Sequence, residues 1–231
     1  MALLQVVKDV CAVVGVAVPQ SVFSNITGNR TMQEMLSLAN EMAQRIAYDN
    51  CDWMALEAGS IFTGDGVSER FPLPANYKRM RLNTNVWRSS SPGQPMRFIA
   101  DSEEWMRRTS YDGRGEWLLG GGDMRIRPTL PVGITASFLY LDKNCINLAS
   151  GGRGDVFMSD TDTFVLDERV LKLGMIWQWK AQKGASYAED MGTYGDALGY
   201  AMGHDRPAPI ILGRSPISAS ATVAYPWPVP T

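Results

Sequence analysis

Apolar residues recur at helical spacing in three parts of the chain. The first stripe, within residues 3–14, comprises Leu3, Val6, Val7, Val10, Val13 and Val14. Gly15 and Pro19 predict where this first helix ends. The second stripe comprises Met35, Leu38, Met42 and Ile46, with Ala39 and Ala43 beside it. Thr31 and Glu34 have the spacing of a capping box, so we expect the second helix to begin there and to end near residues 49–51.

The third and longest helical pattern runs from Asp167 to Met202, and we expect a break at Gly184. Its first half places four apolar residues on one face, namely Val170, Leu173, Trp177 and Ala181. Trp177 and Trp179 are two positions apart and therefore point to different sides of the helix. One of them can enter the bundle core while the other meets a neighbour, or both can be core residues.

The second half of this pattern is rich in glycine. Four glycines fall near one face, namely Gly192, Gly195, Gly199 and Gly203. Each one costs about 1 kcal/mol relative to alanine in a helix. We therefore expect either close approach of a neighbouring backbone or a helix that is held by its assembly.

Between Gly59 and Phe157 the segments are short, aromatic and broken by glycine and proline, which indicates strands. The expected strands are Ser60–Thr63, Val67–Phe71, Arg79–Arg88, Met96–Ile99, Glu116–Leu119, Met124–Arg127 and Ile134–Leu141. A turn over Gly120–Asp123 should join two of them, and a short helix is expected over Asp101–Thr109. The middle of the chain is therefore predicted to be an antiparallel β-domain.

The last part of the chain, residues 207–231, contains six prolines and one charged residue, Arg214. This composition predicts an extended arm near the polyproline II conformation that docks onto another surface. The predicted fold is α+β: a helical bundle made from N- and C-terminal helices, an inserted antiparallel β-domain and an extended C-terminal arm. The expected boundaries are 1–56, 57–162, 163–204 and 205–231.

Composition narrows the classes of function. The 231 residues carry a net charge of −2, so no global field draws the chain toward DNA or a membrane surface. Cys11, Cys51 and Cys145 have no paired spacing, and we expect reduced thiols in a protein assembled in a cytoplasm. With a single histidine and no CxxC motif, neither a metal site nor a cofactor is expected. No transmembrane helix or signal peptide is expected.

Motifs for catalysis are weak. His204 lies at a predicted helix end, where a histidine usually interacts with the helix dipole. Asp160 and Asp162 fit a loop or helix-cap cluster better than a cation site, and Glu103 and Glu104 fit a solvated helix face. Seven arginines are interleaved with acidic residues, which predicts a salt-bridged surface. These arginines are Arg79, Arg81, Arg107, Arg108, Arg114, Arg125 and Arg127. No catalytic residue is expected.

Residues 159–190 read SDTDTFVLDERVLKLGMIWQWKAQKGASYAED. This run resembles the C-terminal helix region of head-to-tail adaptor proteins of tailed bacteriophages, most closely those of short-tailed phages, also called upper tail tubular proteins. The N-terminal LLQVVKDVCAVVGVAVPQSV and the CDWMAL that follows the second helix add to the resemblance. It covers roughly residues 2–205 and is a pattern of positions, without a catalytic signature.

The resemblance implies a structural virion protein at the head–tail junction, assembled in the host cytoplasm. Such adaptors form a ring, usually of twelve subunits, that joins the portal protein to the tail nozzle or tube and lets DNA pass through its lumen without specific binding. The expected bundle and interface residues are Val170, Leu173, Trp177, Trp179, Ala181, Gly195 and Gly199. The expected portal-binding arm residues are Pro207, Pro209, Ile210, Ile211, Leu212, Tyr225 and Trp227.

Two alternatives remain open at this point. Another tail structural subunit, such as a nozzle or tail-completion protein, would share the same general features. A peptidoglycan-cleaving tail enzyme would need two carboxylates facing a cleft, about 5–10 Å apart. The sequence alone does not give the separation of any two carboxylates.

Overall fold

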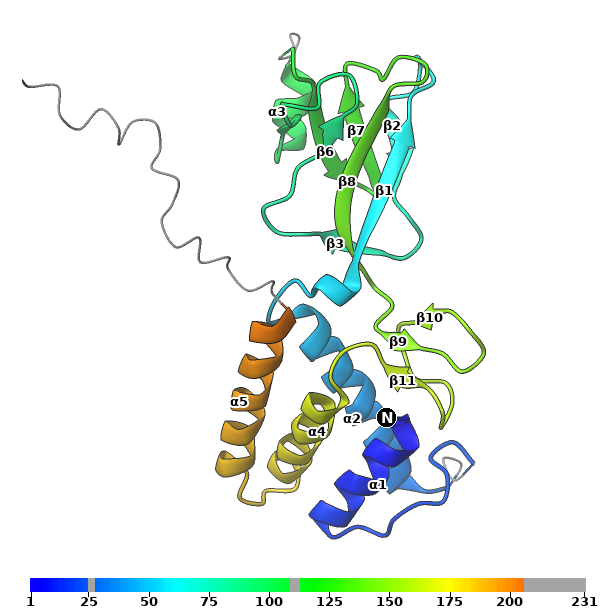
Figure 1. Cartoon of the computed structure of the whole chain (residues 1–231), viewed down its shortest axis with the longest axis vertical. Helices are drawn as coiled ribbons and strands as arrows, with labels where there is room; N and C mark the ends of the chain where they lie inside the picture. The colour runs from blue at the N-terminus through cyan, green and yellow to red at the C-terminus, as the bar shows by residue number, and fades with distance from the viewer. Residues whose placement is uncertain (25–27, 109–112, 206–231) are drawn as a thin grey trace, which may run out of the picture.

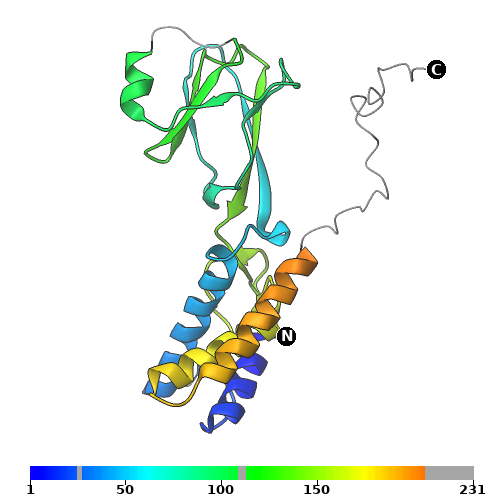
Figure 2. The ribbon, with the colours of Figure 1, turned by 90° about the vertical axis from the view of Figure 1, so that its left-hand side faces the viewer.

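A computed structural model describes residues 1–24, 28–108 and 113–205. The fold is α+β, with helices gathered at one end of the molecule and most of the strands at the other (Figures 1 and 2). We call these two parts the helical body and the β-domain. Helices from both ends of the chain build the helical body, and the β-domain comes from the middle of the chain.

Four helices form the helical body: α1 (Leu3–Val14), α2 (Arg30–Tyr48), α4 (Glu168–Gln182) and α5 (Ala188–Asp205). Helix α4 packs against each of the other three, so it is the central element of this part. Gly15 ends α1 in the left-handed conformation, with a φ of 73°, as the sequence predicts. The break between α4 and α5 falls at Gly184, whose φ is 70°, which confirms the predicted interruption.

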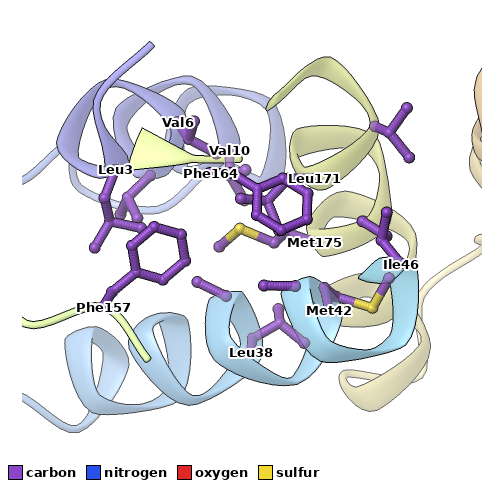
Figure 3. Close-up of a cluster of buried hydrophobic side chains, with 14 of the residues drawn as sticks. Leu3, Val6, Val10, Leu38, Met42, Ile46, Phe157, Phe164, Leu171 and Met175 are labelled. Atoms are coloured by element: carbon purple, nitrogen blue, oxygen red, sulfur yellow. The ribbon is translucent and has the colours of Figure 1, made fainter. Parts of the chain in front are cut away.

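The core of the helical body contains residues of the predicted apolar stripes and two aromatic residues from the segment that precedes α4 (Figure 3). Its labelled members are Leu3, Val6, Val10, Leu38, Met42, Ile46, Phe157, Phe164, Leu171 and Met175. Phe157 and Phe164 follow the β-domain in sequence but are buried among these helices. The chain has therefore returned to the helical body before α4 begins.

Two details of the first helices differ from the prediction. Val13 does not join the buried stripe of α1, because it is 57% exposed. The capping box is also wrong: Asn29 caps α2 by accepting hydrogen bonds from the N–H groups of Thr31 and Met32. Glu34 instead forms ion pairs with Arg30 and Lys183. Asn29 occupies the residue directly before the helix, where an asparagine side chain reaches these N–H groups.

The β-domain contains two sheets. In the first sheet, β8 (Thr135–Asp142) pairs with β1 (Glu57–Thr63) on one side and with β3 (Tyr77–Met80) and β4 (Trp87–Arg88) on the other. The second sheet has the order β2 (Arg70–Pro72), β7 (Asp123–Arg127), β6 (Glu116–Gly120) and β5 (Arg97–Phe98), with α3 (Ser102–Arg107) beside it. A core that includes Phe62, Phe71, Trp117 and Phe138 lies between the sheets.

The prediction of an antiparallel β-domain needs two corrections. Strand β5 pairs with β6 in parallel, because the chain returns through α3 before it forms β6. The single strand expected over residues 79–88 is divided into β3 and β4. Asn83, between them, has a φ of 58°, which is incompatible with an extended strand. A small third sheet, formed by β10 (Arg153–Gly154), β9 (Ile146–Asn147) and β11 (Thr163–Phe164), lies beside the helical body (Figure 1).

The joint between the two parts is polar. Asp52, between α2 and the short 3-10 helix η1 (Met54–Leu56), pairs with Arg79 of β3 at 2.5 Å. Arg81 pairs with Glu57 at the start of β1. The Tyr48 hydroxyl, at the end of α2, donates to the Asp142 carbonyl at the end of β8 over 2.9 Å. The contacts of Asp52 and Tyr48 hold the end of α2 against the base of the first sheet, and the Arg81–Glu57 pair lies within that sheet's base.

Candidate interaction surface

The buried face of α4 differs from the predicted one. Val170 is fully buried, but Leu173, Trp177 and Ala181 are only partly buried. The buried residues of α4 are Val170, Leu171, Gly174, Met175, Ile176 and Trp179. Trp179 is 6% exposed and belongs to the core of the helical body. Trp179 is therefore the tryptophan in the core, whereas the predicted stripe through Trp177 lies on a partly buried side of the helix.

Trp177 has a different role, because it connects α4 with α5. Its ring centroid lies 6.4 Å from that of Tyr187 and 6.0 Å from that of Tyr194. Its indole N–H is buried and has no hydrogen-bond partner among the described residues. Burying such a donor costs about 1–3 kcal/mol. The aromatic contacts join α4 to the start and the middle of the segment that forms α5.

Helix α5 buries one side and leaves the opposite side uncovered. Ala197 and Leu198 are buried against the helical body. The four glycines predicted to share a face, Gly192, Gly195, Gly199 and Gly203, are exposed, and a Cβ added to any of them would meet no described atom within 4 Å. Tyr200 lies beside them and is 72% exposed. We call this surface the glycine face of α5; the close approach predicted for it is not made by any described residue of the same chain.

A cavity of about 680 Å³ lies between the C-terminal half of α5, η1 and the start of α4. Trp53, Val165, Leu166 and Ala197 contribute apolar lining. The acids at its border are already engaged: Asp167 caps α4, and Asp205 accepts the Met54 N–H at 2.7 Å. His204 lies in the last turn of α5, as expected for a histidine near a helix C-terminus. The lining holds no serine, threonine or cysteine beside this histidine.

Asp160 and Asp162 hold loop segments in place by accepting hydrogen bonds from them. Asp160 accepts hydrogen bonds from the Ser21 hydroxyl and from the backbone N–H groups of Val22 and Phe23. Asp162 is 1% exposed and accepts three backbone N–H groups, those of Ala149, Met158 and Ser159. Their position in a loop agrees with the sequence-based interpretation. Among the described residues no group of acids, cysteines and histidine could hold a metal ion.

Several arginines of the β-domain pair with carboxylates, as the interleaved charges predict. Arg125 differs, because its buried Nε has no hydrogen-bond partner among the described residues. Glu103 and Glu104 on α3 pair with Arg107 and Arg108. Arg108 also reaches Glu116, whose side chain is 1% exposed, at 3.0 Å. A further pair joins Arg127 to Glu69 at 3.2 Å, and the Arg127 guanidinium lies over the Trp105 ring. These paired cations do not form the unneutralised stripe that a phosphate backbone requires.

The buried thiols are unreactive in character. Cys11 and Cys145 are buried and form no disulfide. Burial raises the pKa of the Cys145 thiol to about 11, and it also raises the pKa of Cys11. A thiol that stays protonated is a poor nucleophile. Burial likewise raises the pKa of the neighbouring Tyr48 hydroxyl, which keeps this tyrosine neutral where it donates to Asp142.

The residues expected to form the portal-binding arm lie outside the described residues; they are Pro207, Pro209, Ile210, Ile211, Leu212, Tyr225 and Trp227. In the described part of the chain, no helix combines the length and the hydropathy that spanning a membrane requires.

A comparison with known protein families and with curated protein sequences finds no match for this chain. The functional proposal therefore depends on the residues themselves.

Proposed function

We propose that this chain is a structural virion protein, a subunit of a ring-shaped adaptor that joins a portal vertex to a phage tail nozzle or tube. Double-stranded DNA would pass through the lumen of the ring. The observation that carries the proposal is the resemblance of residues 159–190 to phage head-to-tail adaptors. In the fold these residues form β11, α4 and the beginning of α5, which are central to the helical body.

The arrangement of the two parts supports an adaptor role. The helical body and the β-domain lie at opposite ends of an elongated molecule (Figures 1 and 2). The Asp52–Arg79 ion pair and the hydrogen bond from Tyr48 to Asp142 join the two parts. A subunit with two separate ends can contact one partner assembly with each end, as a connector between two rings must.

The glycine face of α5 supports assembly into a ring. In a cyclic ring every subunit uses two different surfaces to meet its two neighbours. Gly195 and Gly199 leave room for a neighbouring backbone, and Tyr200 adds an exposed aromatic side chain beside them. We assign this face to the contact between subunits. Such a contact would account for four glycines that otherwise weaken the helix.

The C-terminal segment is assigned to the portal. It begins at the end of α5, where Asp205 is held against Met54. Its composition, apolar and rich in proline, suits an arm that docks in an extended form, since proline reduces the entropy lost on binding. Tyr225 and Trp227 are the aromatic residues available as anchors.

The ion pairs and hydrogen bonds of the acidic residues favour a structural role over peptidoglycan cleavage. A glycosidase needs a protonated acid and a second carboxylate across a cleft. The acids that the sequence singled out are engaged elsewhere: Glu103 and Glu104 by arginines, and Asp160 and Asp162 by loop N–H groups. A nozzle or tail-completion subunit would not conflict with these features, so the experiment must separate that alternative from the adaptor.

Binding to purified portal protein in the absence of other tail proteins separates the two structural roles. We expect the full chain to co-sediment with portal rings, and a nozzle protein of the same tail to do so only when this chain is also present. If the chain binds the nozzle protein but not the portal, it is a more distal tail subunit and the adaptor assignment is wrong. Clearing of purified peptidoglycan by the chain would support the enzymatic alternative.

A further inference from the structure

Strand β1 is an open edge of the first sheet. It pairs with β8 over all seven of its residues, and among the described residues no strand pairs with its other side. Exposed edges are usually protected by proline, lysine or a bulge, because unpaired N–H and C=O groups invite another strand. The sequence of β1, EAGSIFT, contains neither residue, and its register with β8 is unbroken.

The hydrogen-bond pattern shows which groups are unpaired. The Gly64 N–H donates to the Ile134 carbonyl, directly beyond the end of the paired register. Because antiparallel bonding alternates along a strand, Phe62, Ser60 and Ala58 bond to β8. Gly59, Ile61 and Thr63 therefore direct their N–H and C=O groups away from β8. The edge offers a ladder of three residues to an incoming strand.

Ile61 adds an apolar surface beside this ladder. Phe62, on the opposite face of β1, is buried between the sheets, whereas Ile61 is 67% exposed. Ile61 borders a shallow cavity of about 450 Å³ that also includes Trp87 and Leu139. Trp87 is itself 40% exposed. An added strand with small apolar side chains on this face would cover Ile61.

Residues 217–223, which lie outside the described residues, have the sequence pattern that such a strand requires. They read ISASATV, so that apolar and polar residues alternate strictly over seven positions. This alternation is typical of a strand with one apolar face. The apolar face would carry Ile217, Ala219, Ala221 and Val223, and the other face would carry Ser218, Ser220 and Thr222. Its length equals that of β1.

The chain can bring this strand to β1. Asp205 accepts the Met54 N–H at 2.7 Å, and Met54 lies three residues before the start of β1, so the segment begins at the base of this strand. The eleven residues 206–216 can span about 34 Å at 3.1 Å per residue. Strand β1 is about 23 Å long at 3.3 Å per residue. Either end of β1 is therefore within reach.

We propose that residues 217–223 add to the free edge of β1 of the same chain as an antiparallel strand, with their apolar face toward Ile61. The added strand supplies partners for the outward backbone groups of Gly59, Ile61 and Thr63. It leaves Tyr225 and Trp227 beyond the strand, where they stay available to another protein. This inference concerns the isolated chain and does not depend on the ring or on the portal.

Hydrogen exchange at single amides of the isotope-labelled full-length chain tests the proposal. We expect the amides of Gly59, Ile61 and Thr63 to exchange at least about tenfold more slowly in the wild type than in the double variant Ala219→Pro/Ala221→Pro. Proline removes the N–H donors and the extended pairing of the added strand. Ala208→Pro, which lies outside the seven residues, is the matched control and should leave the slow exchange unchanged.

The amides of Ala58, Ser60 and Phe62 provide an internal reference, because they are bonded to β8. They should keep wild-type protection in every variant, which shows that the β-domain remains folded. Equal exchange of Gly59, Ile61 and Thr63 in the wild type and in the double proline variant would overturn the proposal. If the exchange of these three amides becomes slower as the protein concentration rises, the added strand comes from a second copy. This result would also contradict the assignment to the same chain.

Discussion

Gly174 of α4 lies directly against Met42 of α2. A Cβ atom added at residue 174 would come within 2.5 Å of the Met42 terminal methyl carbon and 3.2 Å of the Tyr194 ring. Met42 is 1% exposed, so its side chain can make room only by shifting within the core. Gly174 thus allows α2, α4 and α5 to meet at one point, and among the described glycines of α4 and α5 it is the one at which a close approach is made.

Replacing this glycine should weaken the helical body. Gly174→Ala gains up to about 1 kcal/mol of helix propensity but crowds the core, which costs about 1–3 kcal/mol. We expect a net loss of about 1 kcal/mol in the free energy of unfolding, measured by urea denaturation. A variant as stable as the wild type would mean that Met42 moves aside without cost.

The exposed glycines of α5 should respond in the opposite way. Gly195→Ala and Gly199→Ala meet no described atom, so each should stabilise the isolated chain by up to about 1 kcal/mol. If the glycine face contacts a neighbouring subunit, the same substitutions should reduce assembly on portal rings, measured by sedimentation. Stabilisation together with full assembly would remove the glycine face from the subunit interface.

The two tryptophans of α4 should differ in their effect on stability. Trp179 is a core residue, and Trp179→Ala should cost about 3 kcal/mol of unfolding free energy. Trp177 is partly exposed and contacts two tyrosines, so Trp177→Ala should cost roughly half as much. Denaturation of both variants under one set of conditions provides the comparison. A larger loss at Trp177 would contradict the burial described for α4.

The ion pairs of Glu34 predict a dependence of stability on pH. The Lys183 ammonium and the Arg30 guanidinium lower the pKa of Glu34 from its ordinary value of 4.5, because both favour the carboxylate. The stabilisation is fully present above pH 4.5 and is lost as the pH falls through the lower pKa of the folded state. Glu34→Gln should therefore flatten the dependence of unfolding free energy on pH in this acidic range.

A matched control for this effect is available on the same helix. Glu41→Gln removes a carboxylate that pairs with Arg45 four residues away and does not link α2 to α4. If both variants change the pH dependence equally, the link between Glu34 and Lys183 has no particular role. A wild-type pH profile in Glu34→Gln would lead to the same conclusion.

Periodicity predicted the helices well, because a buried stripe must repeat with the helical turn. Leu38, Met42 and Ile46 are all buried in α2. The same reasoning placed Trp177 on the apolar stripe of α4 and left open which of the two tryptophans enters the core. That helix contacts three others, so its buried residues extend around the cylinder and no single stripe describes them. The choice between Trp177 and Trp179 depends on where α5 lies, which the local pattern does not contain.

Strand pairing was harder to predict, because alternation gives the two faces of a strand and not its partner. The parallel pairing of β5 with β6 follows from the path of the chain through α3. The close contact at Gly174 is not predictable for a related reason: one glycine in a helical pattern does not identify its neighbour. The four glycines of α5 recur on one face, but no described residue of the same chain lies close to that face.

The central claim is that this chain forms a ring at a portal vertex. Electron microscopy of the purified full-length protein mixed with its portal protein tests it most directly, and the portal must be present because adaptor subunits can be monomeric alone. The account predicts a second ring of density coaxial with the portal, with one copy of this chain for each subunit position and an open lumen. Portal rings that remain bare at saturating concentrations of the chain would contradict it.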